Sequence, residues 1–376
     1  MNIAVNTRLL IKNKLEGIGW FTYESLKRIT TQHPEHHFYF IFDRAYNPAF
    51  IFSSNITPIV LYPQARHPLL FWFWFESRLP RLLKQLNPDL FVSPDGYLSL
   101  KTNIKSLAVF HDLNFEHYPK DLPFAFRRYY RYFFPKFAKK AIRIATVSEF
   151  SKQDISKQYG IPPQQIDVVY DGANELYQPL TPELISGTRE KYTFGCPYFI
   201  FIGSLHPRKN LVNLFKAFDL FRQDHPGDVK LLIVGARKWW TKEIRTAFRE
   251  MKFANDVVFS GRLNADELVQ VLGASLALTY VSYFEGFGIP IVEAFRCGVP
   301  VITSNVTSMP EVAGDAALFV DPFQPVSIAG AMKKLAEDES LRNDLIRKGQ
   351  DRKNEFTWQK TADLLWESIE KAIKSS

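Results

Sequence analysis

The sequence predicts an α/β protein made of two doubly wound domains, each a parallel sheet with helices on both faces. The chain has 376 residues, more than the roughly 250–300 residues at which a single hydrophobic core stops growing. Short β-rich runs alternate with longer helical runs, which is typical of parallel sheets. One polar break, rich in proline and glycine, divides this alternation into two halves.

Short runs rich in apolar and β-branched residues predict the strands of the first half. They are Ile3–Asn6, Phe38–Phe42, Ile56–Val60, Leu90–Ser93, Leu107–Phe110 and Ile144–Val147. Longer segments with helical character predict the helices between them. They are Ile18–Thr31, Leu70–Leu86, Pro123–Lys140 and Glu149–Tyr159.

The second half repeats the pattern. Its predicted strands are Tyr198–Ile202, Lys230–Val234, Val257–Ser260, Leu276–Tyr280, Pro300–Thr303 and Ala317–Val320. Its helices are expected to begin near Asn210, Thr241, Ala265, Ile289, Met309 and Pro325. Right-handed crossovers follow from the repeated β-α units.

The break runs from Gly172 to Pro197 and has no sustained period, so we expect an interdomain linker there. Rossmann-like domains are then expected at residues 1–175 and 176–355, with an amphipathic helix at 356–376 that is able to pack back on the N-terminal domain. The two sheets would face each other across a cleft lined by the carboxyl ends of their strands, where ligands bind in such folds.

Composition narrows the class of protein. A hydrophobic content of 46% and a charged content of 23% are those of a globular chain and exclude a disordered one. The net charge of +8 favours an anionic partner, such as nucleic acid, a phosphorylated ligand or a membrane surface. Two isolated cysteines form neither a disulfide framework nor a zinc motif, and no run is long enough for a signal peptide or a membrane span. We expect a cytoplasmic protein, soluble or peripheral to the membrane.

The stretch "YFEGFGIPIVEAFRCGVPVIT" carries the strongest chemical signal. Glu285 precedes a glycine loop that leads into a helix near Ile289, and Glu293 lies about one turn into that helix. Free N–H groups at a helix N-terminus favour phosphate, and two carboxylates beside a phosphate suit neutral hydroxyls, such as those of a ribose and a sugar. The alternative is a glycine turn whose glutamates are satisfied by backbone donors.

This stretch resembles the signature of retaining glycosyltransferases of family 4, which have the GT-B fold, and further motifs extend the resemblance over nearly the whole chain. In "YFIFIGSLHPRKNLVNLFKAF", Arg208 and Lys209 precede a helix at a strand's carboxyl end, which suits a diphosphate. The family often has an arginine directly after the glycine, where this chain has Ser204, a variant similar to the mannosyltransferase-like branch. A solvated loop pair is the alternative reading.

Other motifs concern the first half. In "LAVFHDLNFEHYP", a strand delivers His111 and Asp112 to its carboxyl end. The resemblance implies that His111 contacts the donor sugar; a structural role is the alternative. Gly17 and Gly19 precede a helix, where the family has a glycine loop near acceptor and phosphate. Ser148 stands at the start of another helix, where the family match and a helix-capping role explain a serine equally well.

The resemblance implies a complete set of site residues. Catalytic residues are His111, Glu285, Arg208 and Lys209. The donor-binding residues are Gly203, Ser204, Gly235, Gly261, Arg262, Gly286, Phe287, Gly288, Ile289 and Glu293, and the acceptor or phosphate loop residues are Gly17, Gly19, Asp112 and Ser148. No metal or cofactor is expected, because the cations would neutralise the leaving diphosphate.

The implied reaction transfers a hexose with retention, first of all mannose from GDP-mannose, to a glycan or polyprenyl-linked acceptor in cell-surface polysaccharide or glycolipid synthesis. The alternatives are glucosyl or N-acetylhexosaminyl transfer from a UDP-sugar, and a non-catalytic partner subunit of the same fold. A Rossmann dehydrogenase is disfavoured, because no G-x-G-x-x-G follows the first strand.

Two segments mix aromatic residues with arginine and lysine: "HPLLFWFWFESRLPRLLKQL" and "LPFAFRRYYRYFFPKFAKKA". Such faces suit an anionic membrane interface. The alternatives are core aromatics with a solvated basic face and, least favoured, stacking on nucleic-acid bases; the partners we expect therefore include the membrane surface and no nucleic acid.

Overall fold

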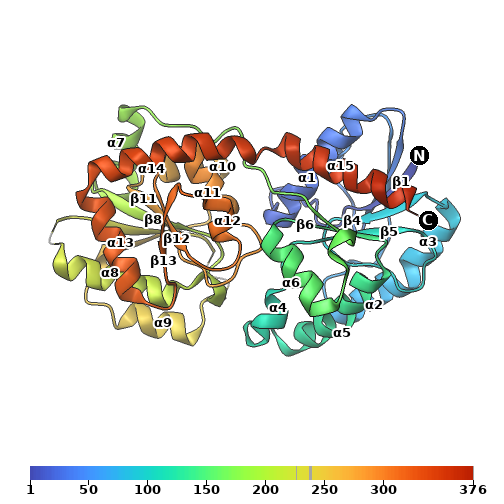
Figure 1. Cartoon of the computed structure of the whole chain (residues 1–376), viewed down its shortest axis with the longest axis horizontal. Helices are drawn as coiled ribbons and strands as arrows, with labels where there is room; N and C mark the ends of the chain where they lie inside the picture. The colour runs from blue at the N-terminus through green and yellow to red at the C-terminus, as the bar shows by residue number, and fades with distance from the viewer. Residues whose placement is uncertain (226, 237–238, 376) are drawn as a thin grey trace. The chain divides into compact units, whose positions relative to one another are not determined.

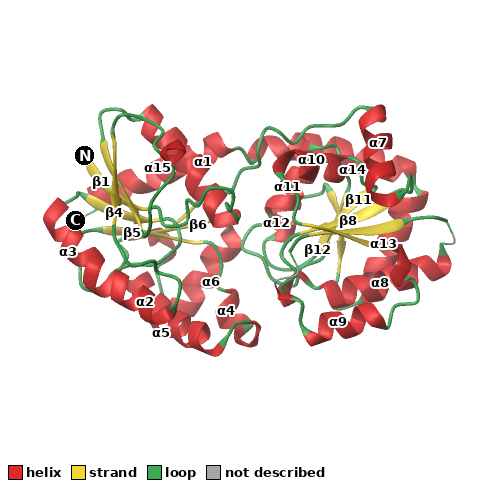
Figure 2. Cartoon of the chain, turned by 180° about the vertical axis from the view of Figure 1, so that it is seen from behind, coloured by secondary structure: helices red, strands yellow, loops and turns green. Residues whose placement is uncertain are grey.

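The computed structural model describes residues 1–225, 227–236 and 239–375, so the last residue of the expected C-terminal helix segment, 376, lies outside the described part. Contacts divide the chain into two compact units, shown in Figures 1 and 2. The first unit is Met1–Gly172 together with Trp358–Ser376, and the second is Ala173–Thr357.

The first unit contains a seven-stranded sheet in the order β3-β2-β1-β4-β5-β6-β7, and all of its strand pairs are parallel. The strands are β1 Asn2–Asn6, β2 His37–Phe42, β3 Ile56–Val60, β4 Leu90–Ser93, β5 Ser106–Phe110, β6 Arg143–Thr146 and β7 Ile166–Val168. The sequence predicted six of them; the short edge strand β7 was missed.

Helices cover both faces of this sheet (Figure 1). The helices α1 and α15 pack on each other on one face, and α2 and α5 are in contact on the other. The helices are α1 Gly17–Gln32, α2 Pro68–Phe73, α3 Leu79–Leu86, α4 Asn114–His117, α5 Phe124–Lys140, α6 Glu149–Tyr159 and α15 Trp358–Lys374. A π-helical segment at Trp74–Arg78 joins α2 to α3, so the helix expected at Leu70–Leu86 is continuous but irregular.

The second unit contains a six-stranded parallel sheet in the order β10-β9-β8-β11-β12-β13. The strands are β8 Tyr198–Ile202, β9 Lys230–Val234, β10 Val257–Gly261, β11 Ala277–Tyr280, β12 Val301–Ser304 and β13 Ala317–Val320. The helices are α7 Pro182–Thr193, α8 Leu211–Asp224, α9 Lys242–Arg249, α10 Ala265–Gly273, α11 Ile289–Arg296, α12 Met309–Ala313, α13 Pro325–Glu337 and α14 Glu339–Arg352.

The segment from Gly172 to Pro197, where we expect an interdomain linker, contains a helix that was not predicted. Helix α7 occupies Pro182–Thr193, where the Thr181 side chain accepts a hydrogen bond from Leu184 N and a proline stands in the first turn. Threonine followed by proline is a helix-start signal, and the sequence analysis overlooked it. Helix α14 was also missed.

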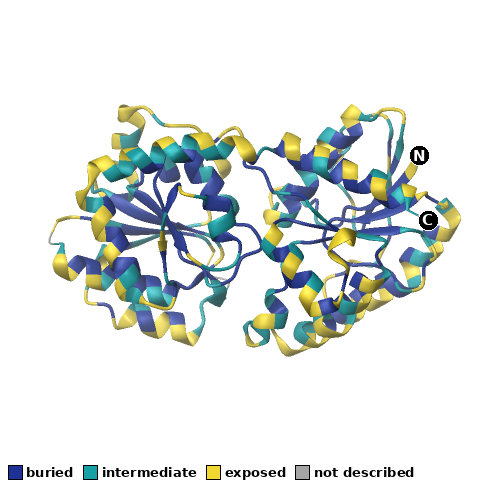
Figure 3. Cartoon of the chain, in the orientation of Figure 1, coloured by how far each residue is buried: buried dark blue, intermediate teal, exposed yellow. Residues whose placement is uncertain are grey.

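Burial explains why the strands are easy to recognise. All five residues of β5 and of β8 are buried, because helices cover both faces of each sheet. Figure 3 shows buried strands inside helices whose outer faces are exposed. Within the described residues, no helix has the length and apolarity needed to cross a bilayer.

The strand order reverses once in each sheet. In the first unit the chain passes from β1 to β2 and β3 on one side and then to β4 on the other. In the second unit it passes from β8 to β9 and β10 and then to β11. Ligands of doubly wound sheets bind at the carboxyl ends of the strands beside such a reversal. The loops after β1 and β4, and after β8 and β11, are therefore the places to look for a site.

Candidate active site

Glycines line the carboxyl edge of the second sheet. Gly203 and Gly235 follow β8 and β9, Gly261 is the last residue of β10, and all three have positive φ. Gly235 N donates to the Gly261 carbonyl at 2.9 Å, and Gly203 N to the Val234 carbonyl at 3.0 Å. A Cβ at Gly235 would lie 1.9 Å from the Gly203 carbonyl oxygen. Only glycine permits this close approach of the two backbones.

Three charged side chains meet at the reversal between β8 and β11. Glu285 Oε2 accepts a hydrogen bond from Arg208 Nη1 at 2.5 Å, and Glu285 Oε1 forms an ion pair with Lys209 Nζ at 2.6 Å. Lys209 Nζ also donates to the Tyr280 hydroxyl at 2.5 Å. Glu285 and Lys209 are 5% and 7% exposed, while the Arg208 side chain is 20% exposed. We call Arg208, Lys209 and Glu285 the charge cluster.

The cluster keeps Glu285 ionised. Burial alone would raise the pKa of Glu285, but the charges of Arg208 and Lys209 and their hydrogen bonds outweigh it and lower the pKa to about 2. At neutral pH the carboxylate therefore accepts hydrogen bonds and donates none. The cluster has one more positive than negative charge, which suits an anionic ligand.

Backbone contacts lock the two loops of the cluster together. Tyr283 N donates to the Arg208 carbonyl at 3.0 Å, and Arg208 Nη1 donates to the Phe284 carbonyl at 3.0 Å. Asn210, in the left-handed conformation at φ 63°, donates from Nδ2 to the carbonyls of Val281 at 2.9 Å and Pro322 at 2.7 Å. The cations are thus held on a turn that is tied to the neighbouring strand.

The glycine loop leads into α11 as expected. Gly288 has φ 109° and stands just before the helix, and Pro290 lies in the first turn. The Ser308 hydroxyl donates to the carbonyls of Glu285 at 3.0 Å and Phe287 at 2.9 Å, which fixes the loop from the side of β12. Gly286 and Phe287 are buried, and Ile289 is half-buried.

The second glutamate has a protein partner that the sequence did not reveal. Glu293 is half-buried and hydrogen-bonds to Tyr177. Burial raises the pKa of Glu293 to about 7, and the Tyr177 hydrogen bond opposes this shift. The two glutamates therefore differ in protonation behaviour, since one stays ionised and the other titrates near neutrality. Of the remaining expected residues in this unit, Ser204 and Arg262 are exposed.

In the first unit, His111 lies at the carboxyl end of β5. Its Nε2 is 2.8 Å from the Pro94 carbonyl, and its ring packs edge-on against Phe21 with centroids 5.0 Å apart. Burial lowers the pKa of His111. A neutral imidazole that donates from Nε2 to the carbonyl leaves Nδ1 as its acceptor nitrogen. Asp112 accepts from Asn114 N at 3.0 Å, the contact of a local turn.

The other first-unit residues stand at helix starts. Gly17 opens α1 and Gly19 lies in its first turn, where a Cβ would be 3.2 Å from Leu15 Cδ2. Ser148 caps α6, because its hydroxyl accepts a hydrogen bond from Ser151 N at 3.1 Å. This contact supports the capping interpretation.

A buried polar network that the sequence analysis missed lies at the reversal of the first sheet. Arg8 Nε donates to Asp95 Oδ2 at 2.8 Å, and Asn6 Nδ2 donates to Asp95 Oδ1 at 2.8 Å. The side chains of Arg8 and Asp95 are only 5% and 4% exposed. The Arg8 guanidinium lies 4.3 Å from the Tyr97 ring centroid, among further aromatic rings. Arg8 and Asp95 lie just after β1 and β4, and this position at the ends of neighbouring strands is the signal that could have identified them.

The two aromatic and basic segments divide between core and surface. Phe71, Trp74, Phe75, Tyr129, Phe134 and Phe137 are buried in the first unit's core. The exposed apolar side chains of α2 and α5 form what we call the aromatic–basic surface, which consists of Leu69, Leu70, Trp72, Phe73, Phe124 and Tyr132. Cations accompany it: Arg127 lies 5.4 Å from the Phe124 ring centroid and Lys136 lies 3.5 Å from that of Tyr132.

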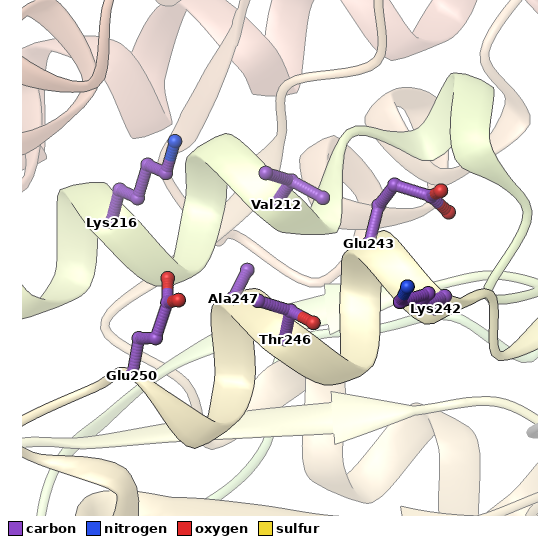
Figure 4. Close-up of a pocket in the computed structure, with 7 residues that line it drawn as sticks. All are labelled: Val212, Lys216, Lys242, Glu243, Thr246, Ala247 and Glu250. Carbon is purple, nitrogen blue, oxygen red and sulfur yellow. The ribbon is translucent and has the colours of Figure 1, made fainter.

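A hollow lies between α8 and α9 (Figure 4). It is lined by Val212, Lys216, Lys242, Glu243, Thr246, Ala247 and Glu250. It contains none of the expected site residues and no glycine loop. We do not assign the site to it.

Comparisons with known protein families match both units. The family described as "Glycosyl transferases group 1" matches residues 189–352. The family described as "Glycosyltransferase Family 4" matches residues 17–175. The first match contains the charge cluster, α11 and the glycine edge, and the second contains His111.

Relatives and solved structures agree with these matches. The chain is 27% identical to the O-antigen chain mannosyltransferase B of Escherichia coli, over 93% of this chain and 94% of the relative. It is 26% identical to an O-antigen chain mannosyltransferase of Salmonella typhimurium, over 76% and 73% of the two chains. The structure resembles Anabaena HepE in complex with UDP and glucose, with a TM-score of 0.77, 18% identity and coverage of 99% and 100%. It also resembles WaaG, a glycosyltransferase involved in lipopolysaccharide biosynthesis, with a TM-score of 0.74, 16% identity and full coverage of both chains, 100% and 100%.

Proposed function

Since the chain belongs to glycosyltransferase family 4, whose members are retaining hexosyltransferases of the GT-B fold, we propose that it transfers mannose from GDP-mannose to a hydroxyl of a glycan or lipid-linked acceptor. The observation that carries this proposal is the charge cluster at the β8–β11 reversal. A buried carboxylate held ionised beside two cations matches the needs of a sugar joined to a diphosphate.

The charged residues and the glycines at the carboxyl edge of the second sheet each have a proposed role. Arg208 and Lys209 neutralise the charge that grows on the leaving diphosphate, helped by the N–H groups at the start of α11. Glu285 accepts hydrogen bonds from donor-sugar hydroxyls, and Glu293 accepts from the ribose. Gly203, Gly235 and Gly261 allow the nucleotide to approach the backbone. The acceptor hydroxyl attacks from the face that the diphosphate leaves, and the leaving phosphate takes its proton.

Residues of the first unit also have roles in this proposal. His111 is neutral and its Nε2 is engaged by a backbone carbonyl, so Nδ1 is the nitrogen that accepts from a sugar hydroxyl. Gly17, Gly19, Asp112 and Ser148 belong to the acceptor side. No metal ion is assigned to the reaction, because the cations of the protein perform the electrostatic task.

The choice of mannose rests on relatives. Two of them are named as O-antigen mannosyltransferases, and one is similar over nearly its whole length. A UDP-sugar is the alternative donor, supported by the complex of HepE with UDP and glucose. A non-catalytic subunit of the same fold is disfavoured, because the charged residues expected of an enzyme are all present and paired.

A donor screen tests the proposal. The purified chain would be heated with GDP, UDP, ADP and their sugar nucleotides, and each stabilising donor would then be assayed for release of its nucleoside diphosphate. We expect GDP and GDP-mannose to raise the melting temperature most and GDP-mannose to be turned over. Stabilisation by UDP alone would replace mannose with a UDP-sugar. No stabilisation by any nucleotide would contradict the enzyme assignment at this site.

We further propose that the protein works in the cytoplasm, at an anionic membrane surface that presents a lipid-linked acceptor. The support is the aromatic–basic surface, in which Trp72 is 48% exposed, Phe124 is 62% exposed and Tyr132 is 58% exposed. Exposed aromatic rings with cations beside them suit the headgroup region of an anionic bilayer. Vesicle sedimentation tests this with the double variant Trp72→Ser, Phe124→Ser.

The expected result is salt-sensitive binding of the wild type to vesicles that contain phosphatidylglycerol, and loss of binding in the double variant. Phe194→Ser is the matched control, because Phe194 is 83% exposed but lies in the second unit. Equal binding by wild type and double variant, or no wild-type binding, would contradict the membrane proposal and leave the donor assignment untouched.

A further inference from the structure

We propose that His33, Glu35 and His36 form a binding site for a divalent transition-metal ion such as Zn²⁺, separate from glycosyl transfer. The three residues lie between α1 and β2, in the segment "HPEH" of the first unit. Among the described residues they form a group of potential ligands, with one donor atom from each side chain lying within 4.8 Å of the others. Two imidazoles and a carboxylate are a ligand set that zinc accepts.

The carboxylate already lies between the two imidazoles. Glu35 Oε1 is 3.6 Å from His33 Nδ1 and 3.2 Å from His36 Nε2. Ligand atoms at 2.0–2.1 Å from a tetrahedral ion are about 3.3 Å from one another. These two ligand–ligand distances are close to those of a coordinated ion, and all three candidate ligand atoms lie within 4.8 Å of one another.

Trp366 orients both imidazoles. The His33 ring stacks on Trp366 with centroids 3.8 Å apart, and the His36 ring stacks on it at 5.2 Å. The two histidine rings are parallel within 7° and 6.1 Å apart. Both imidazoles therefore contact the same indole, with their planes nearly parallel to each other.

This arrangement is compatible with a shared ion. Metal ions bind imidazole nitrogens in the plane of the ring, and each of the two nearly parallel rings has one nitrogen close to Glu35 Oε1. With nitrogen–metal distances near 2.0–2.1 Å, two such rings have centroids about 5–6 Å apart. The observed separation of 6.1 Å is close to this range. The nitrogen of Met1 lies 3.2 Å from His36 Nδ1, and Glu35 Oε1 lies 3.2 Å from His36 Nε2, so Nε2 is the nitrogen that faces the carboxylate of the proposed ligand set.

The ion would connect two distant parts of the chain. Trp366 is on α15, which packs on α1, whereas the proposed ligands follow the end of α1. Fixing both imidazoles against Trp366 would strengthen the packing of α15 on the first unit. The ion therefore stabilises the fold and takes no part in the reaction.

An ion-binding experiment on untagged, EDTA-treated protein tests the proposal. Zn²⁺ binding is measured by titration calorimetry, and Ni²⁺ binding by quenching of tryptophan fluorescence, because a bound Ni²⁺ beside Trp366 quenches its emission. We expect one Zn²⁺ per chain and a rise in melting temperature. His33→Ala, His36→Ala and Glu35→Gln should each weaken binding about 10-fold or more.

His37→Ala is the matched control, because His37 is the adjacent residue but its ring packs on Tyr39 and its Nε2 contacts Thr57. It should bind Zn²⁺ like the wild type. Trp366→Phe should keep Zn²⁺ binding and lose most of the Ni²⁺-dependent quenching. Absence of Zn²⁺ binding to the wild type, or equal affinity in the double variant His33→Ala, His36→Ala, would overturn the proposal.

Discussion

Replacing Glu285 by glutamine removes one negative charge from between two cations and leaves the side-chain shape unchanged. In the folded chain Arg208 and Lys209 lower the pKa of Glu285 from its ordinary value of 4.5 to about 2. A difference of one pKa unit corresponds to about 1.4 kcal/mol, so the ionised carboxylate contributes about 3 kcal/mol to folding at neutral pH. We expect Glu285→Gln to lower the free energy of unfolding at pH 7 by about that amount.

The sign of the pH dependence follows from the lowered pKa. Stability from Glu285 is fully present above pH 4.5 and is lost as the pH falls toward 2, because the unfolded carboxyl takes up its proton first. The glutamine variant has no such contribution to lose. The difference between wild type and variant should therefore shrink by about 1.4 kcal/mol between pH 7 and pH 3.5.

Urea unfolding of both proteins at pH 7 and pH 3.5 measures this difference. Unfolding is monitored by a signal from the second unit. Glu311→Gln is a suitable control, because it removes a carboxylate from α12 and leaves the charge cluster intact. A pH-independent difference, or a wild type no more stable than Glu285→Gln at pH 7, would refute the reasoning about the cluster.

Four further outcomes are expected. Glu293→Gln should gain about 2.5 kcal/mol of stability relative to the wild type as the pH rises from 5 to 8, because burial raises the pKa of Glu293 from 4.5 to about 7 and ionising it in the folded chain is costly. Urea unfolding across this range measures the difference, and a constant difference would contradict the prediction. Gly235→Ala should lower the free energy of unfolding by about 3 kcal/mol or more, since its Cβ would lie 1.9 Å from the Gly203 carbonyl oxygen. The control Gly330→Ala in α13, with open space around it, should be neutral or stabilising in thermal melts. Asp95→Ala should lower the free energy of unfolding by about 3–5 kcal/mol, because it leaves the charge of the buried Arg8 uncompensated. Asp344→Ala, which breaks exposed ion pairs, should lower it by less than about 1 kcal/mol. Urea unfolding measures both, and similar losses would argue against a tightly coupled network. His111→Ala should lower the rate of sugar transfer much more than the affinity for the nucleoside diphosphate, as measured by steady-state kinetics and calorimetry, and an unchanged rate would remove His111 from the site.

The sequence predicted the fold class because the central strands of the two sheets are buried on both faces and are recognisable as short apolar runs. β8 is an example, with five buried residues in "YFIFI". The missed strand β7 has only three residues and lies at the sheet edge, so it lacks this pattern. The missed helix α7 has a weak apolar face, with only Thr188 and Thr193 buried, so its periodicity gave no signal.

The candidate site was predictable where its residues are close in the chain or follow a recognisable strand. The glycine loop and the two glutamates fall within one short motif. The partners of these residues were not predictable, since they depend on tertiary contacts. Tyr177 pairs with Glu293 from 116 positions away, and Arg208 pairs with Glu285 from 77 positions away. The Arg8–Asp95 network was missed for the same reason, because neither residue belongs to a local motif.

The central claim is that the charge cluster binds the diphosphate of the donor. Titration calorimetry tests this claim by comparing the affinity of two variants, Lys209→Met and Lys216→Met, for the preferred nucleoside diphosphate. Lys216 is in α8, and Lys209 is in the turn before α8. Lys209 belongs to the charge cluster, whereas Lys216 lines the hollow between α8 and α9. We predict that Lys209→Met weakens binding at least about 10-fold, the loss of one charge-assisted hydrogen bond, and that Lys216→Met binds like the wild type. Equal affinities for a folded Lys209→Met and the wild type would contradict the account.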